Sequence, residues 1–293
     1  MVAGVALTNP DRVLYAEQGL TKHDLAEYYA AIAPAMLPHL ASRPITMLRC
    51  PAGSVKKCFF QKHPGRLAPK SLRQVRIREK ATTGGYFIAD DAAGLVSLVQ
   101  IGVLEIHAWG AKTNDLDHPD RLVFDLDPAD EVPWAQTVAG AVEIRDRLTA
   151  FGLRSFVKTS GGKGLHVVVP LAPVAPWAAV KAFAKGLAAA MAHDASSVYT
   201  TALPKAERAG RIFIDYLRNE RGATTVAPYA TRARPGATVS TPLAWSELTP
   251  KLTPAAFNVE TVPQRVAADP WAGMTALKQT IPDQALVRLE RAD

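Results

Sequence analysis

The sequence predicts an α+β fold, in which helices pack against a sheet. Two observations lead to this prediction. From residue 121 to 216 the patterns follow the order strand, helix, two strands joined by a short loop, helix, strand. Another set of helical and strand-like patterns precedes them, and the 293 residues hold neither an internal repeat nor a low-complexity segment. A chain of this length is sufficient for one large domain or two modest ones.

The N-terminal part is expected to form a long helix after a turn at residues 7–10. Thr21 is the expected N-cap, and Asp24 three positions later would complete a capping box with a shorter acid. From Lys22 to Leu40 the apolar residues recur at helical spacing. The other elements expected before residue 110 are a hairpin at 84–85, a strand at 86–88 and a buried, helix-like segment at 92–106.

The later elements are bounded by stop signals. Pro128 ends the first strand, and Gly152 ends the helix that follows it. The expected elements are a strand at 121–128, a helix at 132–151, strands at 155–159 and 165–169, a helix at 177–191 and a strand at 211–216.

The strand at 121–128 carries the first chemical signal. Asp125 and Asp127 lie two positions apart, so both side chains would point away from the apolar face of the strand. Two carboxylates this close repel each other unless a cation lies between them. Mg²⁺ or Mn²⁺ suits such oxygen ligands where no Cys or His is nearby. The alternative is a strand that ends in two solvated acids and an Asp-Pro turn.

The loop at 160–164 carries the second signal. Its glycines would let backbone N–H groups approach a phosphate, and Lys163 and His166 would add positive charge there. The loop lacks the spacing of a P-loop and leads into a strand, so the alternative is a tight hairpin whose glycines only permit positive φ. A third acid, Asp215, lies on the expected strand at 211–216.

The segment 56–80 is basic, and Glu79 is its only acid. Phe59 and Phe60 lie among the cations, and this interleaving favours unstacked nucleic acid, because the charges meet phosphates and the rings stack on bases. The alternatives are solvated cations and a short strand with both Phe side chains in the core, and one of the two is expected to be in the core in either case. The cations are Lys56, Lys57, Lys62, Arg66, Lys70, Arg73, Arg76, Arg78 and Lys80.

Three polar residues, Asn9, Arg12 and Lys22, surround the start of the long helix. Spare N–H groups and the helix dipole favour an anion at such a place. On the sequence alone, solvated surface charge explains this cluster as well. His107 is explained by a structural role, since a lone His at the end of a buried segment is more often structural than a ligand.

The composition sets further bounds. Hydrophobic residues make up 48% and charged residues 21%, as in a soluble globular protein, and the formal charge of +7 favours a polyanionic partner. We expect neither a signal peptide nor a membrane span, and therefore a cytoplasmic protein. Cys50 and Cys58 have neither metal spacing nor a second pair, so reduced thiols are expected.

Taken together, the acids and the phosphate-friendly loop fit two-metal nucleotidyl transfer, in which the cations neutralise charge on the phosphates. Two alternatives remain open. A metal-dependent glycosyltransferase would also use an acidic pair, but it leaves the basic segment unexplained. A non-catalytic DNA-end-binding module would explain the basic segment, but not three acids on strand-like stretches.

Three motifs are jointly specific: RLVFDLDP at 121–128, TSGGKGLHV at 159–167 and RIFIDYLRN at 211–219. With them the chain resembles, over nearly its whole length, the polymerase domain of bacterial DNA ligase D. This domain is a branch of the archaeo-eukaryotic primase superfamily that is used in non-homologous end joining. The resemblance implies a primase-type core with an RNA-recognition-like sheet flanked by helices. It also implies an N-terminal α/β module packed against that core. The expected parts are an N-terminal DNA-binding module at about 1–110, a catalytic core at about 111–240 and a C-terminal tail on the core at about 241–293.

The resemblance also implies a role for each of several residues. Asp125, Asp127 and Asp215 would be the catalytic metal ligands. The residues that would hold the incoming nucleotide are Ser160, Lys163, His166, Arg232 and His107. Phe59 and Phe60 would stack on the template, and Asn9, Arg12 and Lys22 would bind a 5′-phosphate of the downstream strand, although relatives carry Lys where this chain has Arg12.

The function implied by the resemblance is that of a DNA-directed DNA/RNA polymerase, a template-directed nucleotidyltransferase that fills gaps and extends 3′ ends at DNA breaks. Its cofactors would be two Mn²⁺ (or Mg²⁺) ions, and its substrate a nucleoside triphosphate, with ribonucleotides preferred. The expected partners are gapped duplex or broken ends with a 5′-phosphate, Ku and a DNA ligase, at the bacterial nucleoid. Because no K-x-D-G adenylation motif is present, the chain is expected not to seal a nick, whether it is an excised domain or a free-standing relative.

Overall fold

The computed structural model describes residues 1–65, 68–282 and 285, and these residues divide into two compact units. Unit 1 comprises Met1–Asn114, Thr224–Thr241 and Pro254–Asp269, and unit 2 the remainder. The predicted division into three consecutive parts differs from this, because 224–241 and 254–269 belong to unit 1. No helix in the described ranges is both long and apolar enough to cross a membrane.

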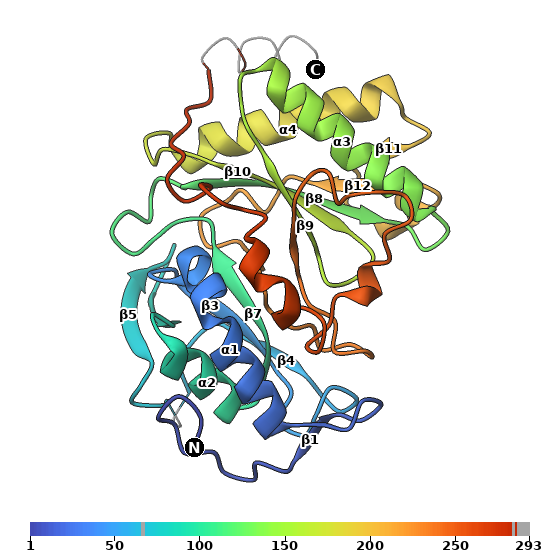
Figure 1. Cartoon of the computed structure of the whole chain (residues 1–293). Helices are drawn as coiled ribbons and strands as arrows, with labels where there is room; N and C mark the ends of the chain where they lie inside the picture. Colours follow the sequence, from blue (N-terminus) through green and yellow to red (C-terminus); the bar gives the residue numbers. More distant parts are fainter. Residues whose placement is uncertain (66–67, 283–284, 286–293) are drawn as a thin grey trace. The chain divides into compact units, whose positions relative to one another are not determined.

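Unit 1 is built on a sheet with the strand order β13-β7-β3-β6-β5, in which β4 also pairs with β3 (Figure 1). All of its strand pairs are antiparallel. A two-stranded ribbon of β1 and β2 leads into the first helix. The strands are β1 (Val13–Tyr15), β2 (Leu20–Thr21), β3 (Ile45–Arg49), β4 (Phe59–Gln61), β5 (Arg73–Arg78), β6 (Thr83–Ile88), β7 (Val103–Trp109) and β13 (Thr224–Val226).

Helix α1 (Lys22–Leu40) has the predicted bounds and the predicted N-terminal cap. The Thr21 hydroxyl accepts a hydrogen bond from the backbone N–H of Asp24 at 3.2 Å, and the Asp24 carboxylate accepts one from the Thr21 N–H at 2.8 Å. The Tyr29 hydroxyl hydrogen-bonds the Thr231 hydroxyl at 2.9 Å. This contact ties the segment after β13 to α1, although the two residues are far apart in the sequence.

The predicted helix-like segment at 92–106 is wrong in its second half. Helix α2 (Ala92–Gln100) ends before Gly102, which has φ 81°, and strand β7 follows. Both halves are buried, so neither shows the periodicity that separates a helix from a strand. Gly102 was the signal that could have divided them, because a positive φ ends a helix.

The predicted hairpin at Gly84-Gly85 is also misplaced. Both glycines lie within β6, and the turn is closed by a hydrogen bond from the Glu79 N–H to the Thr82 carbonyl at 2.8 Å. A Cβ on Gly84 would collide with the His63 ring. The glycine therefore permits the His63 ring to approach β6 closely, and the strand predicted at 86–88 is confirmed as part of β6.

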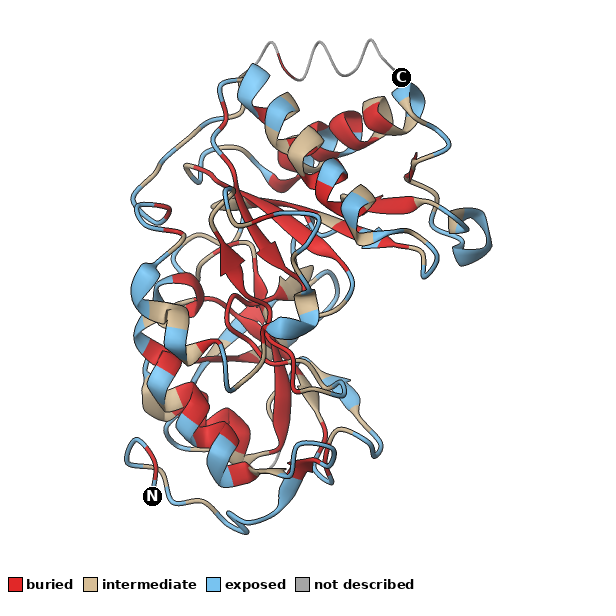
Figure 2. Cartoon of the chain, turned by 45° about the vertical axis from the view of Figure 1, so that its right-hand side comes forward, coloured by how far each residue is buried: buried red, intermediate tan, exposed pale blue. Residues whose placement is uncertain are grey.

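Unit 2 is built on a sheet with the strand order β11-β12-β8-β10-β9-β14, and its strands are buried over most of their lengths (Figure 2). Only β11 and β12 pair in parallel. The predicted strands are confirmed with small changes at their ends. The strands are β8 (Arg121–Pro128), β9 (Phe156–Thr159), β10 (Leu165–Pro170), β11 (Tyr199–Thr200), β12 (Ile212–Asp215) and β14 (Pro242–Leu243).

Two helices, α3 (Trp134–Ala150) and α4 (Trp177–Asp194), cover one face of this sheet (Figure 1). A Cβ on Gly140 of α3 would lie 3.2 Å from the Leu126 side chain, so Leu126 faces the helices. Side chains alternate along a strand, and Asp125 and Asp127 therefore lie on the opposite face.

The opposite face of the unit 2 sheet carries a cluster that includes Val123, Trp271 and Met274. The Trp271 indole donates a hydrogen bond to the Val157 carbonyl at 2.9 Å. The end of this face near Val123 is thus closed by the C-terminal segment. Three short 3₁₀ helices complete the described structure: η1 (Lys205–Arg208), η2 (Pro254–Ala256) and η3 (Pro263–Ala268).

Cys50 and Cys58 form a disulfide, so the prediction of reduced thiols is wrong. Strand pairing explains the bond. Arg49 at the end of β3 lies opposite Phe59 at the start of β4, and the cysteines flank this pair on the side of the connecting loop. Spacing that does not suit a metal site does not exclude a disulfide, and the loop between Cys50 and Cys58, which lie 8 positions apart, is closed by the pairing of β3 with β4.

Candidate active site

Asp125 lies at the centre of the polar face of unit 2. Strand β8 pairs with β10 on one side and β12 on the other, and the pairing places His166 and Asp215 directly opposite Asp125. The His166 Nε2 lies 3.4 Å from Asp125 Oδ1. Three residues that the sequence predicted to act together are therefore brought into one row by the register of three neighbouring strands.

The Arg218 guanidinium balances the two acids of this row. Its Nε lies 3.0 Å from Asp215 Oδ2 and 3.7 Å from Asp125 Oδ2. Burial raises the pKa of Asp125 to about 6; Arg218 opposes this shift, while the charges of Asp215 and Asp127 add to it. A carboxylate that is held against its preference for the neutral form requires positive charge nearby.

Asp127 is more open than its neighbours, with 51% of its side chain exposed, and its nearest cation is Arg208 at 3.9 Å. No group of three His, Cys, Asp or Glu side chains in the described ranges is close enough to hold a metal ion as the structure stands. The three predicted ligands thus lie on neighbouring strands of one face, with Arg218 between Asp125 and Asp215.

The loop between β9 and β10 has a tightly defined backbone. The Ser160 hydroxyl accepts hydrogen bonds from the N–H groups of Gly162 and Gly164, both at 3.2 Å. A Cβ on Gly164 would collide with the carbonyl oxygen of Leu126, which is the residue between the two acids of β8. The glycine is thus required for the loop to pass directly beside the carboxylates. Lys163 points to the surface and pairs with Asp130 at 2.8 Å.

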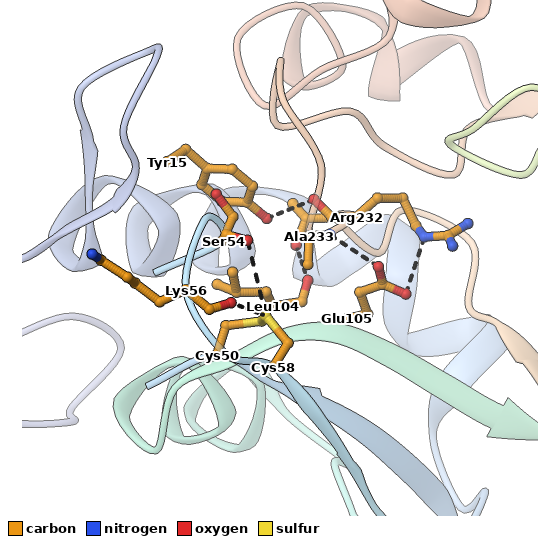
Figure 3. Close-up of a disulfide and its surroundings, with 10 residues drawn as sticks. Tyr15, Cys50, Ser54, Lys56, Cys58, Leu104, Glu105, Arg232 and Ala233 are labelled. Carbon is orange, nitrogen blue, oxygen red and sulfur yellow. Dashed lines mark hydrogen bonds and ion pairs between the residues drawn. A yellow bond between two sulfur atoms is a disulfide. The ribbon is translucent and has the colours of Figure 1, made fainter. Parts of the chain in front are cut away.

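The other two predicted nucleotide residues, His107 and Arg232, belong to unit 1, where a buried carboxylate joins them. Glu105 Oε2 lies 3.0 Å from Arg232 Nε (Figure 3) and 2.8 Å from His107 Nε2, which the figure does not label. Its Oε1 accepts the backbone N–H of Ala233 at 2.9 Å. His107 thus has an acidic partner, which the sequence did not reveal.

Phe59 and Phe60 are both at the surface of unit 1, with 42% and 64% of each residue exposed, so the expectation that one would be in the core is wrong. The Phe60 ring meets the His107 ring edge to face, with centroids 5.5 Å apart. The cations of the basic segment are exposed where they are described. Arg66 lies outside the described residues.

The N-terminal cluster is less exposed than its composition suggests. Asn9 and Arg12 are exposed, whereas Lys22 is 5% exposed. The Lys22 ammonium donates to the carbonyls of Thr8 at 2.9 Å and Gln100 at 3.3 Å, and burial, followed by the charge of Arg12, lowers its pKa. Lys22 is therefore not a solvated helix residue.

Four polar residues that contact or support the predicted site residues were not predicted from the sequence. Arg218 and Asn219 lie within the third motif; Asn219 holds β8 through two hydrogen bonds of 2.8 Å to the backbone of Val123. Lys158 is buried on β9 and lowers the pKa of Asp125. Glu105 is on β7, which was not recognised as a strand. A search for cations next to the acids would have found Arg218.

These features define an α+β protein of the primase type, with acids on neighbouring strands of a helix-covered sheet. Residues 21–271 match the family described as "LigD, primase-polymerase domain". The chain belongs to this family, and the predicted resemblance is confirmed.

Relatives in three bacteria carry the name LigD. The chain is 37% identical over 286 residues to the "Multifunctional non-homologous end joining protein LigD" of Pseudomonas aeruginosa. This match covers 95% of this chain and 34% of that protein. It is 38% identical over 252 residues to the corresponding DNA repair protein of Mycobacterium tuberculosis, with 83% of this chain and 33% of that one covered. The Bacillus subtilis "Bifunctional non-homologous end joining protein LigD" is 30% identical over 260 residues, which are 88% of this chain and 42% of the relative. The chain thus spans about a third to two fifths of these proteins.

A solved structure has the same fold over nearly its whole length. It is described as "Polymerase Domain from Mycobacterium tuberculosis Ligase D in complex with DNA". The TM-score is 0.88 at 35% sequence identity, and the alignment covers 94% of this chain and 99% of that one. The predicted fold class is confirmed by this match.

Proposed function

We propose that the chain is a template-directed nucleotidyltransferase that fills gaps and extends 3′ ends at DNA breaks in non-homologous end joining. The observation that carries the proposal is the row of Asp125, Asp215 and His166 across three neighbouring strands, in a member of the primase-polymerase family. The names of the relatives, which refer to end joining and repair, support the same process.

The acids fit a hard divalent cation. Their ligand atoms are oxygens, which Mg²⁺ and Mn²⁺ prefer, and the pKa of Asp125 is raised by burial and, to a smaller extent, by the charges of Asp215 and Asp127, which Arg218 opposes. Arg218 supplies compensating positive charge in the structure, so Asp125, Asp127 and Asp215 would hold two ions once the side chains adjust. Bound ions of this kind lower the pKa of an attacking hydroxyl and neutralise charge on a triphosphate.

Five residues are proposed to contact the incoming nucleotide. In unit 2, Ser160, Lys163 and His166 surround the polar end of β10, and Lys163 would exchange its exposed partner Asp130 for a phosphate. In unit 1, His107 and Arg232 would contribute two cations. A preference for ribonucleotides and for Mn²⁺ is part of the proposal.

The DNA would bind unit 1. The exposed rings of Phe59 and Phe60 suit stacking on the template base beside a break, and the exposed cations suit the phosphates. Asn9, Arg12 and Lys22 would bind the 5′-phosphate of the downstream strand. Ku and a DNA ligase are the proposed protein partners, and the proposed location is the cytoplasm, at the nucleoid.

Primer extension tests the proposal. The protein is incubated with Mn²⁺, nucleoside triphosphates and a labelled gapped duplex, and extension is followed for the wild type, Asp125→Asn and Asp146→Asn. We expect extension by the wild type and by Asp146→Asn, whose exposed carboxylate lies on α3, and none by Asp125→Asn. Binding of gapped duplex without extension by the wild type would instead support a non-catalytic end-binding module.

A further inference from the structure

Glu105 is a buried acid whose two oxygens are both engaged. It is 3% exposed, and it lies on β7, two positions from His107, so both side chains point to the same face of the strand. One oxygen accepts the Ala233 N–H, and the other lies 3.0 Å from Arg232 Nε (Figure 3). This second oxygen also lies 2.8 Å from His107 Nε2. No step of the proposed reaction has so far used this carboxylate.

The cluster is arranged to keep Glu105 ionised. Burial alone would raise its pKa, but the hydrogen bond from His107 and the charges of Arg232 and His107 outweigh burial and lower the pKa to about 2. Two further titratable groups near the cluster are Tyr15 of β1 and Tyr29 of α1, and burial raises the pKa of both, so they stay neutral. Glu105 is thus the anion of the cluster.

The charge of Glu105 affects the protonation of the His107 imidazole. Arg232 and His107 lie against the same oxygen, and a guanidinium this close would by itself disfavour protonation of the imidazole. The Glu105 carboxylate reverses that effect, because a charged imidazole donates to it more strongly than a neutral one. The Phe60 edge contact and the pairing of β7 with β3 hold the His107 ring in one place.

We propose that Glu105 is a positioning residue that keeps His107 as an imidazolium beside Arg232, so that unit 1 presents two fixed positive charges to the triphosphate of the incoming nucleotide. That the bound ligand is a triphosphate rests on the proposed function. The contacts among Glu105, His107 and Arg232 are independent of the proposed function. The carboxylate and the imidazolium cancel in net charge, so what Glu105 adds is an imidazolium in which both ring nitrogens are N–H donors, one toward Glu105 and the other toward the anionic ligand.

A purely structural role is the competing explanation, since Glu105 also fixes the backbone at Ala233. The positioning role requires the negative charge of Glu105, whereas the structural role requires only a hydrogen-bond acceptor for Ala233. Glu105→Asp keeps a carboxylate in a shorter side chain, whereas Glu105→Gln keeps the shape and loses the charge. Glu27→Gln makes the same change beside another histidine of unit 1, His23 at 3.9 Å, and serves as the matched control.

The first measurement is the NMR titration of the His107 imidazole in the full chain without nucleotide or DNA. We expect the pKa of His107 to fall in Glu105→Gln, to stay closer to the wild-type value in Glu105→Asp and to be unchanged in Glu27→Gln. An unchanged His107 pKa in Glu105→Gln overturns the inference. This outcome does not depend on whether the protein is a polymerase.

The second measurement is the affinity for Mg²⁺-ATP, by fluorescence titration at pH 6 and pH 8. We expect Glu105→Gln to bind about tenfold more weakly than the wild type at pH 8, where its imidazole is neutral, and to lose less affinity at pH 6, where a larger fraction of the imidazole is protonated. Equal losses at both pH values, or none, would overturn the role toward the triphosphate. A wild type that binds Mg²⁺-ATP but extends no primer refutes the proposed function alone and leaves this test intact.

Discussion

At the scale of single residues, the Asp125 carboxylate is held at a cost to stability. The side chain of Asp125 lies between His166 and Asp215, and its pKa is raised to about 6 by burial and by the neighbouring acids, against the opposing effect of Arg218. A residue placed for packing alone would not be charged in this position. Functional sites commonly store unfavourable electrostatics of this kind.

This cost predicts the stability of Asp125→Asn in the presence of a chelator. An unfolded chain ionises this carboxyl near pH 3.8 and the folded chain near 6, so the folded state loses stability as the pH rises between these values. Above this window the loss amounts to about 3 kcal/mol. Asp125→Asn should therefore be more stable than the wild type at pH 7.5, by about 1–3 kcal/mol, and gain little at pH 4.

Guanidinium unfolding at both pH values measures this difference. Asp146→Asn, which changes an exposed acid of α3, should show no gain at either pH. A gain for Asp125→Asn that is the same at pH 4 and pH 7.5 would contradict the electrostatic explanation and indicate a packing effect.

At the scale of elements, the sequence predicted best where a local signal decides the structure. Helix α1 has the predicted bounds because its capping box and apolar spacing agree. The division of 92–106 into α2 and β7 was missed because a buried helix and a buried strand both lack a distinguishing apolar–polar periodicity. Glu105 went unnoticed for the same reason, since its pairing with His107 requires β7 to be a strand. The acids of β8 and β12 were found because their pattern is local, but their common row with His166 comes from strand register.

The loop before β10 provides a prediction about Gly164. A Cβ there would collide with the Leu126 carbonyl, so Gly164→Ala should push the loop away from β8 and displace the backbone between Asp125 and Asp127. We expect a loss of about 2–3 kcal/mol in unfolding free energy and a loss of extension activity. Gly152→Ala is the control: its φ is 75° with open space around it, so it should cost about 1 kcal/mol and leave activity intact.

The disulfide provides a second prediction at this scale. It closes the loop between β3 and β4, and the Ser54 N–H within that loop donates to the Leu14 carbonyl at 2.7 Å. Loss of the cross-link in Cys58→Ser should lower the unfolding free energy by about 2–3 kcal/mol, mainly by freeing the unfolded chain. Denaturant unfolding with and without a reductant measures this. Reductant should lower the unfolding free energy of the wild type and leave that of Cys58→Ser unchanged. A wild-type unfolding free energy that does not change with reductant would mean that the thiols are free.

At the scale of the whole molecule, the discontinuous units could not be read from the sequence. Residues 224–241 return to unit 1 through contacts such as that between Tyr29 and Thr231, which are about two hundred residues apart and leave no local pattern. Arg232 joins the unit 1 cluster because of this return. Among the residues predicted to bind the nucleotide, Arg232 and His107 lie in unit 1, and only the motif resemblance grouped them with Ser160, Lys163 and His166.

The recognition of a 5′-phosphate is the last prediction, and the structure changes how it should be tested. Lys22 is buried and donates to the carbonyls of Thr8 and Gln100, so Lys22→Ala would leave two backbone acceptors without their donor and destabilise the start of α1. Arg12 is exposed and bonds to the Pro51 carbonyl at 2.9 Å, so it can be replaced with less damage. A terminal phosphate carries more negative charge than an internal diester, so Arg12 should bind the terminal phosphate more tightly.

We therefore expect the wild type to bind a gapped duplex with a 5′-phosphate about tenfold more tightly than one with a 5′-hydroxyl, a preference of the size expected for a charge-assisted contact. Arg12→Gln should lose most of this preference while its unfolding free energy and its extension of a simple primer-template stay near wild type. Lys22→Ala should lose both the preference and stability. Equal affinity of the wild type for the two gapped duplexes would show that the cluster of Asn9, Arg12 and Lys22 only anchors the N-terminal turn to α1.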